Sequence, residues 1–172
     1  MTRLLLALGL AVSLLSVPTP AADGVSFVNE GVVDAPIEKV WNVFATSDGY
    51  KVLGPALADV DLRVGGLIRS RYGKDGTLGD AETIENLILA YEPPTMMAIR
   101  IQKTPRTFPF KEAWKHTWTV MTLKPLEGGR TLVRAASLGY GTDDESVAMR
   151  KFFEAGNQQV IQSIQKHFSA GR

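Results

Sequence analysis

The spacing of apolar and polar positions divides the chain into an N-terminal segment, a middle of extended segments and a C-terminal helix. Val25 to Val33 is rich in Val and Phe and predicts a first strand, which Asp34-Ala35-Pro36 ends. Apolar residues at helical spacing from Ile37 to Phe44 predict a short amphipathic helix. Residues 50–57 contain Gly54-Pro55 and form at most a second short helix.

The middle of the chain has the pattern of antiparallel strands. Runs rich in β-branched and aromatic residues alternate with clusters of Gly, Pro and Asp. The predicted strands are residues 60–64, 67–72, 81–91, 96–102, 113–124 and 131–140. The linkers are short and no internal repeat occurs, so we predict a single domain over residues 23–172.

The C-terminal segment changes its apolar period from two to about 3.6. Thr142 and Glu145 have the spacing of a capping box, which places a helix start there. A long apolar stripe follows, formed by Met149, Phe153, Gly156, Val160, Ile164 and Phe168. Such a helix needs a wide apolar surface, and the sheet is the candidate. We therefore predict an α+β fold: a curved antiparallel sheet of six to seven strands wrapped on the long C-terminal helix.

The first 22 residues have the layout of a secretory signal peptide. A basic start at Arg3 precedes an apolar run from Leu4 to Leu15, and small residues follow. A membrane-spanning helix needs about 20 apolar residues, so the run is short for a stable span. We expect cleavage near Ala21 or Ala22 and a periplasmic or secreted location.

Charge and cysteine content narrow the classes of function. Removal of Arg3 would leave 18 of the 19 Lys and Arg residues against 18 Asp and Glu, so the expected mature chain is neutral. A neutral domain argues against nucleic acid as a partner. The chain contains no cysteine, which excludes thiol catalysis and cysteine metal sites.

Four segments resemble the START-like (SRPBCC) superfamily, including its polyketide cyclase-like and Hsp90-activator-homologue-like members. They are Val33-Asp34-Ala35-Pro36-Ile37-Glu38-Lys39-Val40-Trp41, Val64-Gly65-Gly66, Ala90-Tyr91-Glu92-Pro93-Pro94-Thr95-Met96-Met97 and Gly128-Gly129-Arg130-Thr131-Leu132-Val133. The resemblance implies a helix-grip fold with a cavity between the sheet and the long helix. It also implies a hydrophobic or amphipathic small molecule, or a lipid, as the ligand, with no cofactor. This fold hosts both binding proteins and enzymes.

Alternation along the predicted strands selects the side chains that line the cavity. The strand at 113–124 is predicted to turn one apolar face inward, and its period of two takes His116 inward as well. The predicted ligand-binding residues are Ile68, Ser70, Tyr72, Met97, Ile99, Trp114, His116, Trp118, Met149, Phe153, Gly156 and Val160. Both faces of the strand at 81–91 are partly apolar, so the orientation of Glu85 and Asn86 stays open. A packed core with no ligand is the alternative for all these residues.

His116 is the candidate for chemistry. An inward histidine could hydrogen-bond a ligand or act as a general base, or it could be a satisfied structural residue. Binding or transport of the small molecule is the first hypothesis. A cofactor-free cyclase, dehydratase or hydrolase using His116, and a partner-binding module, are the alternatives. The sequence shows no metal-binding motif, so no metal is expected.

The loop at 103–112 combines Phe108 and Phe110 with Lys103, Arg106 and Lys111. Aromatic and basic residues together suit transient contact with a membrane surface or a lid over the cavity. The alternative is that both phenylalanines cover the edge of the core.

Overall fold

A computed structural model describes residues 25–170 of the chain. The signal peptide predicted over residues 1–22 lies outside this range. The elements, in chain order, are β1 (Val25–Val33), α1 (Ile37–Ala45), α2 (Ser47–Tyr50), η1 (Lys51–Leu53), β2 (Leu57–Val60), β3 (Leu67–Arg71), β4 (Ile84–Glu92), β5 (Met96–Lys103), η2 (Ala113–His116), β6 (Trp118–Leu126), β7 (Arg130–Tyr140) and α3 (Asp144–Ser169).

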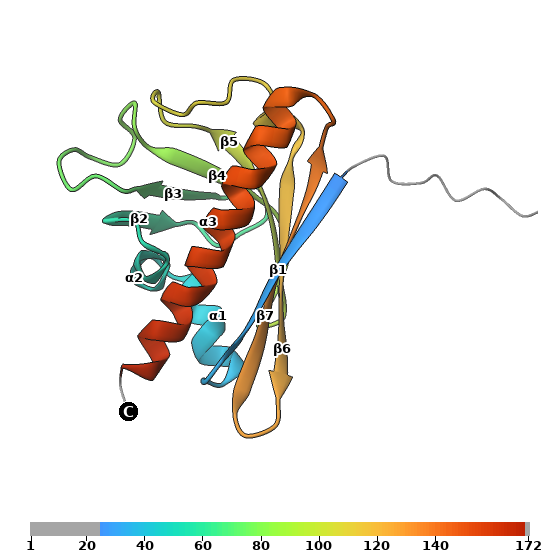
Figure 1. Cartoon of the computed structure of the whole chain (residues 1–172). Coiled ribbons are helices and arrows are strands. Elements are labelled where there is room, and N and C mark those ends of the chain that lie inside the picture. The colour runs from blue at the N-terminus through green and yellow to red at the C-terminus, as the bar shows by residue number, and fades with distance from the viewer. Residues whose placement is uncertain (1–24, 171–172) are drawn as a thin grey trace, which may run out of the picture.

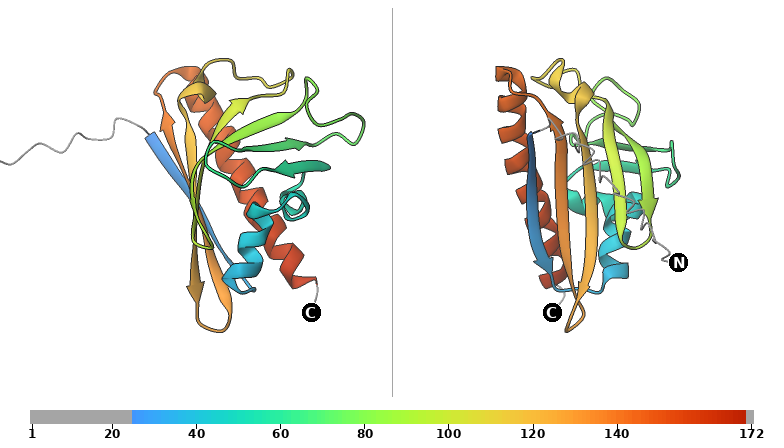
Figure 2. Two further views of the ribbon diagram at one scale, coloured as in Figure 1. Left: turned by 180° about the vertical axis from the view of Figure 1, so that it is seen from behind. Right: turned by 90° about the vertical axis from the view of Figure 1, so that its right-hand side faces the viewer.

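The seven strands form one antiparallel sheet in the order β1-β7-β6-β5-β4-β3-β2. The sheet twists so strongly that β2 and β3 run nearly across the direction of β1, β6 and β7 (Figure 1). All three α-helices lie on one side of the sheet, and α3 crosses that side diagonally (Figures 1 and 2). The predicted α+β helix-grip fold is confirmed, with a sheet of seven strands.

Two apolar clusters hold the helices on the sheet. The main core cluster joins α1 and the C-terminal half of α3 to the sheet, with Val40, Ile68, Met97, Ile161 and Ile164 at most 1% exposed. The second core cluster joins the N-terminal half of α3 to the ends of β1 and β7, through Phe27, Tyr140 and Met149. The contact between β1 and α3 is close because Gly31 has no side chain. A Cβ there would lie 2.4 Å from Cγ2 of Ile161.

Several predicted element boundaries are wrong. The strand placed at 60–64 is β2 and ends at Val60, because Gly65-Gly66 belongs to the turn that leads into β3. The capping box predicted from Thr142 does not form. Asp143 is the N-cap, and its carboxylate accepts hydrogen bonds from the amide (2.9 Å) and the hydroxyl (2.6 Å) of Ser146. The Glu145 carboxylate instead accepts from the backbone amides of Lys111 and Glu112, which ties the 103–112 loop to the start of α3.

Candidate functional site

Part of the sheet that faces α3 is incompletely covered. Register places Asn86, Ile99, Ile101 and Thr119 on the same face as the main core residues Ile68 and Met97, yet these four side chains are partly exposed. We define the inner surface as these four residues together with Tyr50 before η1 and Gly156 and Asn157 of α3. All seven are partly exposed, although they lie between layers that are closely packed elsewhere.

Gly156 marks the middle of α3. Phe153 on one side of it packs against the second core cluster, and Val160 on the other side packs against the main core cluster. A Cβ built at Gly156 would meet no heavy atom within 4 Å, which shows open space. Glycine inside a helix destabilises it by about 1 kcal/mol relative to alanine. Close packing does not require this glycine, so its effect here is to leave space beside the inner surface.

A short chain of polar groups borders that space. The Nδ2 of Asn157 donates to Oγ of Ser137 at 3.2 Å, and this hydroxyl lies 3.4 Å from Oγ1 of Thr119. Ser137 is 1% exposed, whereas Thr119 and Asn157 are partly exposed. The buried serine thus connects two polar side chains whose remaining hydrogen-bonding capacity is accessible.

A second polar group lies at the other end of the inner surface. Burial of the Tyr50 hydroxyl raises its pKa, nearby Tyr72 raises it further, and a hydrogen bond with Asn86 acts in the opposite direction. Partial desolvation of its hydroxyl also raises the pKa of Tyr72. Both phenols therefore stay neutral at physiological pH, and each can donate a hydrogen bond. Tyr72 follows β3 and is 60% exposed, with its ring 3.4 Å from the position of a Cβ on Gly54.

Most of the predicted ligand-binding residues face α3 or lie on it. Ile68, Ser70 and Met97 are buried on the inward side of the sheet, and Ile99 is partly buried beside them. On α3, Met149 is fully buried in the second core cluster. Trp114 and Phe153 pack against that same cluster, whereas Ile68 belongs to the main core cluster. Ligand contact by these residues stays a prediction.

The inward orientation predicted for His116 and Trp118 is wrong. Residues 113–116 form the 3-10 helix η2, so the alternation assumed across this segment does not begin until Trp118. Register pairs Thr119 with Ser137 and Leu123 with Val133, which turns the odd-numbered residues of β6 inward. Trp118 consequently lies on the outer face and is 40% exposed. His116 is exposed as well, which removes the geometric basis for a general base inside the fold.

Sequence reasoning missed several residues of the inner surface. The predicted alternation, which takes Trp114, His116 and Trp118 inward, would turn Thr119 outward, whereas register places it inward. Asn86, whose orientation was open, faces inward beside Ile68, whereas Glu85 faces outward beside Arg69. No sequence pattern indicated an inward position for Tyr50, because it lies in a short, irregular helical segment. The hydrogen bond of Asn157 to Ser137 depends on a contact across 20 residues of sequence, which no local pattern reveals.

The 103–112 loop packs on α3 through its aromatic side chains. The ring of Phe108 lies 5.3 Å from that of Phe110 and 6.0 and 6.1 Å from those of Phe152 and Phe153, between centroids. Phe108 and Phe110 are partly buried, and Phe152 is 52% exposed. Both loop phenylalanines thus cover the edge of the second core cluster, and membrane contact through them stays a prediction. No helix within residues 25–170 is long and apolar enough to span a bilayer.

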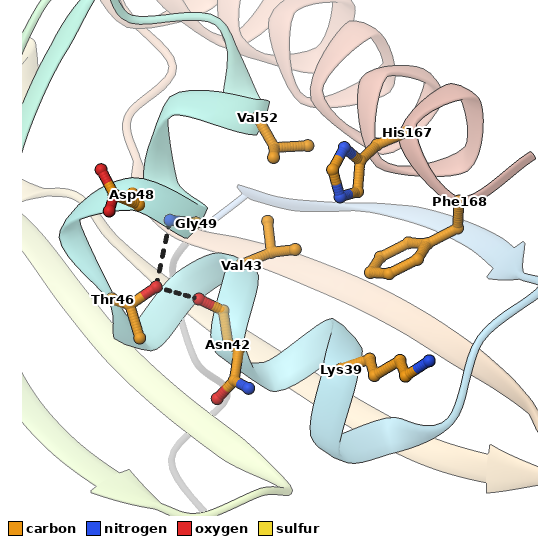
Figure 3. Close-up of a pocket in the computed structure, with 9 residues that line it drawn as sticks. All are labelled: Lys39, Asn42, Val43, Thr46, Asp48, Gly49, Val52, His167 and Phe168. Carbon is orange, nitrogen blue, oxygen red and sulfur yellow. Dashed lines mark hydrogen bonds between the residues drawn. The ribbon is translucent and has the colours of Figure 1, made fainter. Parts of the chain in front are cut away.

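A separate open cleft of about 350 Å³ lies between α1, α2 and the end of α3 (Figure 3). Its apolar residues are Val43, Val52 and Phe168, and His167 and Lys39 come from opposite sides of it. Thr46 borders the cleft but is already bonded to the Asn42 carbonyl (2.8 Å) and the Gly49 amide (3.0 Å). Nowhere in the described part of the chain do three His, Asp or Glu side chains gather to hold a metal ion.

The protein is an α+β domain of the helix-grip class, because its seven-stranded antiparallel sheet packs around one long helix. The family model for Activator of Hsp90 ATPase homolog 1-like protein matches residues 34–169. The chain belongs to this family, which is part of the START-like superfamily predicted from the sequence. Comparison with curated proteins gave no match.

Solved structures support the same fold. The Aha1 dimer from Colwellia psychrerythraea is similar at a TM-score of 0.63 and 17% identity, over 86% of this chain and 98% of that one. An AHSA1-like protein from Aeromonas hydrophila gives 0.62 and 18%, over 86% and 94%. A protein from Mesorhizobium loti gives 0.63 and 17%, over 82% and 94%. At these identities the likeness establishes the fold alone.

Proposed function

We propose that this protein binds a hydrophobic or amphipathic small molecule between the sheet and α3, outside the cytoplasm. The observation that carries the proposal is the open space at Gly156, beside inward-facing side chains that remain partly exposed. Small-molecule sites are typically lined by apolar side chains with a few polar groups that fix orientation. On the inner surface, Ile99 and Ile101 lie between the two polar groups, and the buried side chains of Ile68 and Met97 extend the apolar part of the same face.

The binding proposal is better supported than an enzymatic one. The cofactor-free enzyme predicted as an alternative relied on an inward His116, and that side chain is exposed. The polar side chains of the inner surface are hydroxyls and amides, which can donate and accept hydrogen bonds that orient a ligand. The location outside the cytoplasm rests on the signal-peptide pattern of residues 1–22.

The test is to fill the space at Gly156. In Gly156→Leu, the new side chain enters the region where no atom lies within 4 Å of a Cβ, so the helix should fold unchanged. Affinity for Nile red, an uncharged fluorescent amphipathic probe, is expected to fall at least tenfold in a fluorescence titration. The melting temperature should rise by about 3 °C, because leucine is a better helix former than glycine by close to 1 kcal/mol.

The matched control is Ala155→Leu, which adds a leucine to the neighbouring, exposed position of the same helix. It should bind Nile red as the unmodified protein does. No binding by the unmodified protein, or equal binding by Gly156→Leu, would contradict the proposed site.

A further inference from the structure

In the part of the sheet formed by β2, β3 and β4, charged side chains lie on the outer face and pair with one another. Arg69 is 3.2 Å from Asp59 and 4.0 Å from Glu85, and Arg71 is 2.8 Å from Asp80. Register places Asp59, Arg69 and Glu85 in one row across β2, β3 and β4. The ion pairs of these strands thus lie on the side away from α3.

The inward positions of the same strands are uncharged. The polar ones on β3, β4 and β6 are Ser70, Asn86, Tyr91 and Thr119, and the rest are apolar. In strands β2 to β6, the one charged residue in line with them is Lys103, at the end of β5. Its Nζ donates to the backbone carbonyls of Asp80 (2.8 Å) and Gly79 (3.5 Å) at the sheet edge. On α3, Gly156 and Asn157 complete the inner surface, which contains no ionised group.

An ionic ligand on this surface would lose hydration without gaining a counter-ion. A buried charge is stable only when it is paired and hydrogen-bonded. Apart from Lys103, whose Nζ is bonded to two backbone carbonyls at the sheet edge, no inward side chain of these strands is charged. The same environment acts on the hydroxyl of Tyr50, because burial disfavours its charged form and raises its pKa. Hydroxyl and amide groups can still satisfy a neutral oxygen or nitrogen.

Building on the function proposed above, we infer that the ligand is an uncharged amphipathic molecule with a hydroxyl, carbonyl or amide group bound at Tyr50 and Asn86. Its apolar body lies along Ile101 and Ile99. Thr119 is two strands away from Asn86, about 10 Å across the sheet, and can bind a second neutral polar group. Fatty acids, phospholipids and amines are excluded as preferred ligands.

The experiment compares three probes with the same alkyl chain: 1-decanol, decanoate and decylammonium, at pH 8. Each competes with Nile red on the protein purified without detergent. Decanol should bind at least tenfold more tightly than either ion. Equal or tighter binding of an ion overturns the inference, as does Nile red binding that decanol cannot displace. Nile red binding that is lost in Gly156→Leu supports the proposed function independently, so the two failures are distinguishable.

Variants then locate the polar end of the ligand. Tyr50→Phe and Asn86→Leu should each lower decanol affinity about three- to tenfold, as expected for one hydrogen bond, with little change in melting temperature. Tyr91→Phe is the control, because Tyr91, like Tyr50, packs against the main core cluster, but it pairs with Met97 and lies outside the inner surface. An equal loss of decanol affinity in all three variants, or no loss in the first two, refutes the assignment of Tyr50 and Asn86.

Discussion

The close contact between β1 and α3 at Gly31 leads to a quantitative prediction for Gly31→Ala. The added methyl would lie 2.4 Å from Cγ2 of Ile161 and 3.2 Å from Nε2 of Gln165. Favourable carbon–carbon contacts lie at about 3.5–4.0 Å, so the first distance is short by more than 1 Å. Gln165 can move, but Cγ2 is on the branched Cβ of a residue that is 1% exposed, so it cannot rotate away freely.

Overpacking of this kind costs about 1–3 kcal/mol, and replacing glycine returns about 0.4–1 kcal/mol by restricting the unfolded chain. We therefore expect Gly31→Ala to lower the free energy of unfolding by about 1–2 kcal/mol. For a domain of this size, the melting temperature should fall by roughly 2–8 °C. Urea unfolding followed by tryptophan fluorescence measures this change.

The partner variant is Ile161→Leu, which removes the Cγ2 methyl while keeping the side-chain volume. Alone it should cost less than about 1.5 kcal/mol. Combined with Gly31→Ala, the loss should be smaller than the sum of the two single losses by at least about 1 kcal/mol. Additive losses, or an unaltered stability of Gly31→Ala, would refute a direct steric contact between these residues.

Three further predictions concern the helix cap, a buried hydrogen bond and the N-terminus. Hydrogen bonds from the Ser146 hydroxyl and amide lower the pKa of Asp143, so its stabilising effect is present above the usual Asp range and is lost as pH falls below about 4. Asp143→Ala should lower the melting temperature at pH 7 by about 2–4 °C and make no difference at pH 2, as calorimetry would show. Thr131→Val leaves the Ala35 carbonyl without its 2.7 Å hydrogen bond, which should cost about 1–3 kcal/mol in urea unfolding; an unchanged midpoint would contradict this. Expressed with residues 1–22, the exported protein should begin at Ala22 or Asp23 by intact mass, and recovery of the uncleaved chain would contradict the signal-peptide prediction.

The sequence was most informative where one period continues over many residues. The apolar stripe from Met149 to Phe168 predicted α3, and the strand pattern predicted the sheet, because both depend on burial of a regular face. The site was harder to predict from the sequence. Which of its residues face inward depends on where the alternation of each strand begins and on how the strands pair. Trp114, His116 and Trp118 alternate as if in one strand, although a turn of 3-10 helix separates them. The inward position of Asn86 became evident only from its pairing with Ile68 and Ile101.

The separation of the two core clusters along α3 has a mechanical consequence. The helix packs on the sheet near Met149 and again near Ile161 and Ile164. Between these contacts, Glu154 and Asn157 are hydrogen-bonded to Asn29 and Ser137 of the sheet, but Gly156 faces open space. A molecule bound beside Gly156 would contact this segment without moving the parts of the helix that pack on the two core clusters. Slower amide hydrogen exchange would then be confined to residues 154–160. The exchange rates of the α3 amides at the two core clusters would not change. The distance along α3 between the two core clusters, rather than the volume of either cluster, would set the length of the largest molecule that the fold accepts.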